Sequence, residues 1–132
     1  MHRLPVNTHQ KMEMLDITQM VRQVVAQEGI QEGIAVIYSP HTTAAITVNE
    51  NWDDDVVHDV LLFLRQTIPT RYPGFRHQEG NSDSHLMVNL IGSSATVIVQ
   101  QGELMLGKWQ GIFFCEFDGP RDRQFWVQVV GR

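Results

Sequence analysis

Three histidines of this 132-residue chain lie in or beside segments that have little to bury. His77 and His85 belong to the stretch RHQEGNSDSH, which is dense in carboxylates and amides, and His41 follows an apolar run typical of a strand. Neutral imidazole commonly binds divalent metals, and catalytic metal sites often combine three protein ligands with one open position. The trio therefore predicts a metal-assisted site, and three imidazoles favour Zn²⁺ over Mg²⁺. Histidines that are simply solvated or cap a helix are the alternative interpretation.

Side chains suited to acid–base catalysis and to substrate binding accompany the histidines. Glu50 stands at a predicted strand-to-helix turn, and Asp83 lies inside the histidine-rich stretch, so both are candidate catalytic groups. Residues that could contact a substrate through a hydroxyl, amide, indole or guanidinium group are Thr42, Thr43, Asn81, Trp109 and Arg121. Arg121 could hold an anion or pair with Asp118 in the same turn.

Composition excludes several classes of function. The net charge is −5 and the ten basic residues are scattered, so nothing resembles the basic stripe that nucleic-acid binding needs. There is no basic amphipathic helix for a membrane surface, and no apolar run approaches a membrane span of about eighteen residues. The one cysteine, Cys115, lies in an apolar run that is typical of a small buried residue. We expect small molecules or other subunits as partners and a cytoplasmic location.

Hydrophobic periodicity predicts an α+β domain over residues 1–132, with a mainly antiparallel sheet and two helices. The first helix should end at Gly29, and the second should begin at the carboxylates of residues 53–55 and stop at Pro69. Strands are expected near Met12 and Met14, and over residues 34–38, 43–48, 86–91, 96–99, 108–117 and 124–130. Residues 70–85 lack periodicity, which indicates a long functional loop.

The segments SPHTTAAITVNEN, HQEGNSDSHL, LGKWQGIFFCEFDGPRDR and VQVVG resemble, in this order, the YjbQ family, whose members are also named secondary thiamine-phosphate synthases. The resemblance covers residues 12–131. It implies an α+β sandwich with two helices, assembled as a homotrimer. It also implies a metal-assisted enzyme that acts on a small phosphorylated metabolite, with thiamine-phosphate synthase as the named activity. A non-catalytic trimeric module that binds a metal or an anion is the alternative.

Overall fold

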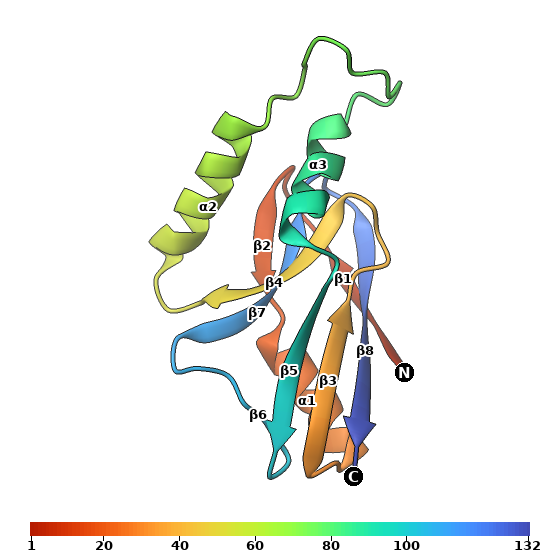
Figure 1. Cartoon of the computed structure of the whole chain (residues 1–132), viewed down its shortest axis with the longest axis vertical. Helices are drawn as coiled ribbons and strands as arrows, with labels where there is room; N and C mark the ends of the chain where they lie inside the picture. Colours follow the sequence, from red (N-terminus) through yellow and green to blue (C-terminus); the bar gives the residue numbers. More distant parts are fainter.

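The computed structural model describes residues 1–132 as eight strands and three helices (Figure 1). In chain order they are β1 (His2–Asn7), β2 (Glu13–Asp16), α1 (Thr18–Glu28), β3 (Glu32–Tyr38), β4 (Ala44–Glu50), α2 (Asp54–Thr67), α3 (Ser82–Ile91), β5 (Ser94–Gln100), β6 (Glu103–Leu104), β7 (Gln110–Glu116) and β8 (Asp122–Gly131). All strand pairs are antiparallel, so the α+β prediction is confirmed. None of the helices combines the length and the apolar character that crossing a membrane requires.

The strands form two sheets. One contains five strands in the order β1-β8-β3-β5-β6, and the other contains three in the order β2-β7-β4. Strand β1 lies at an edge and pairs only with β8. An edge position tolerates Pro5, which has no backbone N–H to give to a second neighbouring strand.

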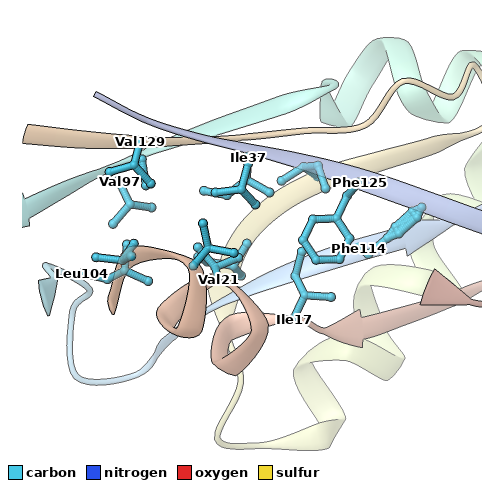
Figure 2. Packing of buried hydrophobic residues seen from close by; sticks show 14 of the residues in the cluster. Ile17, Val21, Ile37, Val97, Leu104, Phe114, Phe125 and Val129 are labelled. Carbon is cyan, nitrogen blue, oxygen red and sulfur yellow. The ribbon is translucent and has the colours of Figure 1, made fainter. Parts of the chain in front are cut away.

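A first apolar core fills the space between the five-stranded sheet, α1 and one face of the three-stranded sheet (Figure 2). Helix α1 contributes Val21, Val24 and Val25, whose helical spacing places them on one face. The helix ends at Gly29, whose φ of 66° is left-handed and costs glycine little. The predicted first helix and its glycine cap are therefore confirmed.

A second core covers the opposite face of the three-stranded sheet, beneath α2 and α3. Successive strand residues point to opposite faces, so Phe114 enters the first core and Phe113 and Cys115 enter the second. Because both faces are covered, β7 is buried along almost its whole length. Helix α3 packs across β4, and Oγ of Ser84 in its first turn donates to the carbonyl of Phe117, which places the start of α3 beside the end of β7.

Helix α3 corrects two expectations. The strand predicted over residues 86–91 is the second half of this helix, and the predicted loop over 70–85 gives way to helix at Ser82. The helix buries Met87 and Val88 but leaves Leu90 exposed. A short apolar run cannot by itself distinguish a buried strand from a buried helix. The domain thus has three helices rather than two, and it gains the unforeseen strands β1 and β6.

Candidate functional site

Three chain connections meet at one end of the molecule and enclose a polar cavity of about 470 Å³. They are the β3–β4 connection, the segment leading from α2 into α3, and the β7–β8 connection, which passes from the smaller sheet to the larger one; all three lie in the upper part of Figure 1. The β3–β4 and β7–β8 connections lie close together because Ala44, the first residue of β4, pairs with Glu116, the last residue of β7. We call this cavity the polar pocket, because its lining is mainly polar: Pro40, His41, Thr42, Thr43, His77, Glu79, Asn81, His85, Arg121 and Arg123.

A buried ion pair supports the wall of the polar pocket. Arg123 donates from Nε to Oε1 of Glu116 at 2.8 Å and from Nη2 to Oε2 at 2.6 Å. Burial alone would raise the pKa of Glu116, but hydrogen bonds from Arg123 and Thr8 outweigh it and hold this pKa below its ordinary value. Nη2 also donates to Oγ1 of Thr43 at 2.8 Å. The remaining nitrogen, Nη1, has no protein partner and is not sealed from solvent, so it is available to a ligand.

Asp118 orients two other side chains of the pocket. Its Oδ2 accepts from Nδ2 of Asn81 at 2.8 Å and from Nη2 of Arg121 at 3.0 Å, while Oδ1 accepts from Nζ of Lys11 at 2.6 Å. Burial opposes ionisation, but these hydrogen bonds prevail and lower the pKa of Asp118 to about 2. The carboxylate is therefore ionised at neutral pH, and the expected Arg121–Asp118 pair is present.

His41 is held in one tautomer by the backbone. Its Nε2 lies 3.0 Å from the backbone nitrogen of Gln124 and must accept the N–H of that group. Burial, followed by the positive charge of Arg123, lowers the pKa of His41 below its ordinary value of 6.5. The ring is thus neutral near pH 7, with its proton on Nδ1, which has no protein partner.

The three predicted metal ligands, His41, His77 and His85, line the same cavity, but they are not arranged as a complete metal-binding site. The rings of His77 and His85 are adjacent, with centroids 5.2 Å apart and planes at 85°. No three side chains of histidine, cysteine, aspartate or glutamate gather as a ligand set. The donor chemistry fits a transition metal, but Nε2 of His41 is occupied by the N–H of Gln124. His41 would have to release this bond to become a third ligand.

The predicted substrate-binding residues divide between the pocket and a distant region. Thr42, Thr43, Asn81 and Arg121 line the polar pocket together with the three histidines. Trp109 does not line it, and instead stacks edge-on with the exposed Trp52, with ring centroids 5.3 Å apart.

The two predicted catalytic carboxylates both lie outside the lining of the pocket. Glu50 pairs with Gln110 at the far end of β4, about 23 Å along the strand from Thr43 at roughly 3.3 Å per residue. Asp83 is buried in the first turn of α3, where Oδ2 accepts from Oγ1 of Thr70 at 3.2 Å and Oδ1 has no partner. Glu79 is the one carboxylate that lines the polar pocket.

Arg123 is not among the site residues predicted from the sequence. The alternation of buried and exposed residues along β8 could have indicated its role. Arg123 occupies the same face of the strand as the buried Phe125 and Val127. A charged residue on a buried face needs a partner, and Glu116 continues the inward face of β7 in the same way. Alternation along β8 would therefore have indicated that Arg123 faces inward, whereas β7 is buried on both faces and its pattern alone does not show which face Glu116 occupies.

Two antiparallel sheets around α1, two helices over the smaller sheet, and a pocket of histidines and arginines at one end define a class of small α+β protein. The family described as UPF0047 protein YjbQ-like matches residues 2–132. The chain belongs to this family.

Relatives cover nearly the full chain. A UPF0047 protein of Methanocaldococcus jannaschii is 48% identical over 96% of this chain and 91% of its own length. The UPF0047 protein YugU of Bacillus subtilis is 46% identical over 97% of each chain. The crystal structure of an uncharacterised YjbQ/UPF0047 protein from Clostridium acetobutylicum superposes with a TM-score of 0.96 at 43% identity, covering 98% of this chain and 100% of the other. These relatives support the fold and the family, and their names state no activity.

Proposed function

We propose that this protein is an enzyme acting on a small phosphorylated metabolite, whose phosphate binds in the polar pocket. The observation that carries the proposal is the pocket lining, which combines two arginines with three histidines among mainly polar side chains. Nη1 of Arg123 and Nδ1–H of His41 are donors without a protein partner. Guanidinium groups suit phosphate oxygens, and Glu116 prevents Arg123 from turning away.

A divalent transition metal, with Zn²⁺ favoured over Mg²⁺, belongs to this proposal. His77 and His85 would hold the ion, and His41 would join them after releasing the N–H of Gln124. When bound, the metal would stabilise negative charge that develops on phosphate oxygens. The chain itself would orient the phosphate through Arg121 and Arg123.

Phosphate binding is the first test. Calorimetric titration of the wild-type protein with inorganic phosphate should show binding, and Arg121→Gln should weaken it about ten- to hundredfold, since a hydrogen bond to a charged group contributes about 1.5–3 kcal/mol. Arg65→Gln, an exposed arginine on α2, is the matched control and should bind as the wild type does. Absence of phosphate binding would contradict the proposal.

Thiamine-phosphate synthase is the particular activity that we propose, on the strength of the resemblance of sequence motifs. In this reaction the thiazole nitrogen forms a C–N bond to the methylene carbon of a pyrimidine diphosphate, the C–O bond breaks, and pyrophosphate leaves. The polar pocket offers charge stabilisation for such a leaving group. Product formation from the two phosphorylated substrates, measured with added Zn²⁺, Mg²⁺ or Mn²⁺ and beside a working synthase, is the test. No turnover with any ion would reject this activity.

A non-catalytic trimeric module that binds a metal or an anion is the alternative. The position of Glu50, at the far end of β4, favours it because the pocket then keeps a single carboxylate, Glu79, as a candidate acid or base. Glu79→Gln separates the two functions. An enzyme should lose turnover and retain phosphate binding, whereas a binding module has no turnover to lose.

Assembly and location complete the proposal. We propose a homotrimer, supported by apolar side chains on the outward face of the five-stranded sheet. Ile34 of β3 is paired in register with both Ile98 of β5 and Val130 of β8, and all three are exposed. We also propose a cytoplasmic location, with which the free and buried Cys115 is consistent.

A further inference from the structure

The segment of residues 71–80, which we call the arch, joins α2 to α3 and stands apart from the rest of the protein (Figure 1). Every residue of the arch is exposed. Its backbone hydrogen bonds close two local turns, from the N–H of Phe75 to the carbonyl of Tyr72 and from the N–H of Gly80 to the carbonyl of His77. None of its side chains forms a hydrogen bond or a salt bridge. The arch is therefore held by few contacts, which is typical of segments that move when a ligand binds.

Both ends of the arch, by contrast, are fixed to the protein. Oγ1 of Thr70 donates to Oδ2 of the buried Asp83 at 3.2 Å, and Nδ2 of Asn81 donates to Oδ2 of Asp118 at 2.8 Å. A cavity of about 450 Å³ borders the arch and is lined only by arch residues and by the flanking Thr70 and Ser82. Because this space contains no packed core, the arch can swing about its anchored ends without displacing buried side chains.

The arch carries two arginines without a counter-charge. Arg71 and Arg76 form no salt bridge, whereas the two arginines of the polar pocket are each paired with a carboxylate. Arg76 directly precedes His77, which lines the polar pocket, while Arg71 directly follows the anchored Thr70. An anion in the polar pocket would therefore attract the arch chiefly through Arg76.

We propose that the arch is a lid that closes over an anion in the polar pocket, and that Arg76 becomes a further ligand of this anion when the lid is closed. This inference rests on the proposed function, because it takes a phosphate in the polar pocket as given. Arg121 and Arg123 belong to the β7–β8 connection and to β8, so they form the fixed part of the phosphate site. Closure of the arch would exclude water and strengthen the electrostatic interactions inside the pocket.

Limited proteolysis of the wild-type protein tests the closure. Trypsin cleaves after arginine, so the open arch offers it Arg71 and Arg76. Saturating inorganic phosphate should slow cleavage after Arg76 about tenfold relative to chloride at the same ionic strength, because cleavage follows the population of the open form. Cleavage of an unrelated peptide in the same mixtures controls for effects on trypsin itself.

Calorimetry under the same conditions separates the possible outcomes. Unchanged cleavage of protein that has bound phosphate would overturn this inference alone. An arch that resists trypsin without phosphate would also overturn it, because such an arch is not open. Failure of phosphate to bind would overturn the proposed phosphate site and the inference with it.

Arg76→Gln and Arg71→Gln form a matched pair of variants, since each removes one positive charge from the arch. Arg76→Gln should weaken the binding of inorganic phosphate about fivefold, because the charged hydrogen bond that it removes is partly offset by the ordering of the arch. Arg71→Gln should bind phosphate as the wild type does. Both arginines are exposed, so both variants should fold, as circular dichroism would show. Wild-type affinity in Arg76→Gln, or an equal loss in both variants, would overturn the inference.

Discussion

The backbone N–H of Gln124 donates to Nε2 of His41 at 3.0 Å and ties the β3–β4 connection to the first residues of β8. This bond uses the lone pair that a metal would need. It also keeps the imidazole neutral, because a protonated ring could not accept it. While this hydrogen bond is made, His41 is a neutral donor that can serve a phosphate. If the bond is released, His41 can serve as the third metal ligand.

The titration of His41 should reveal this bond. NMR of the imidazole should show a pKa below 6.5 and a proton on Nδ1, since burial and Arg123 both disfavour the charged ring. Below pH 6.5 the unfolded chain takes up a proton that folded His41 resists, so this residue should lower stability as the pH falls toward its folded pKa. Arg121→Gln should raise the pKa of His41 by removing a nearby positive charge. A proton found on Nε2 would contradict the assignment.

Metal content should depend on three histidines and not on the others. After incubation with Zn²⁺ and removal of free metal, His41→Ala, His77→Ala and His85→Ala should each lower the bound zinc sharply, as measured by elemental analysis. His9→Ala is the control, because His9 is exposed and lies outside the polar pocket. Zinc should also shift the amide resonance of Gln124, since binding would require His41 to release it. Equal zinc content in all variants would rule out this ligand set.

Removal of the Glu116 carboxylate should destabilise the fold strongly. Glu116→Gln leaves the guanidinium of Arg123 buried without its counter-charge, which typically costs about 3–5 kcal/mol. Urea unfolding measures this loss. The exposed Glu103 provides the control, and Glu103→Gln should stay within about 0.5 kcal/mol of the wild type. A loss below about 1 kcal/mol for Glu116→Gln would show that the pair is not needed for stability.

Assembly should depend on the outward face of the five-stranded sheet. Sedimentation should show a trimer for the wild type at micromolar concentration, and Ile98→Lys should dissociate it by placing a charge among Ile34 and Val130. Phe63→Lys, on the exposed face of α2, should leave the trimer intact. A monomeric wild type would contradict the proposal, and dissociation by Phe63→Lys alone would place the interface elsewhere.

Local patterns in the chain predicted most of the elements. Helical spacing and Gly29 define α1, and Asp53 begins α2 by accepting the N–H of Asp55, as its carboxylate run indicated. Strands β3, β4, β5, β7 and β8 lie within a few residues of the predicted ranges. These features depend on neighbours in sequence, so a single chain contains the information. Helix α3 was not predicted, because its apolar run is too short to distinguish a buried helix from a buried strand. Its packing on β4 selects the helix.

The sequence by itself also marked most of the polar pocket, since His41, His77, His85 and Arg121 belong to polar segments that have no core to serve. Only the tertiary structure decided which segments share an end of the sheet. The antiparallel register of β4 on β7 sets Thr43 beside the Glu116–Arg123 pair and carries Glu50 to the opposite end. Register is a long-range property, because it follows from which faces and strand ends pack together rather than from the residues adjacent in the chain.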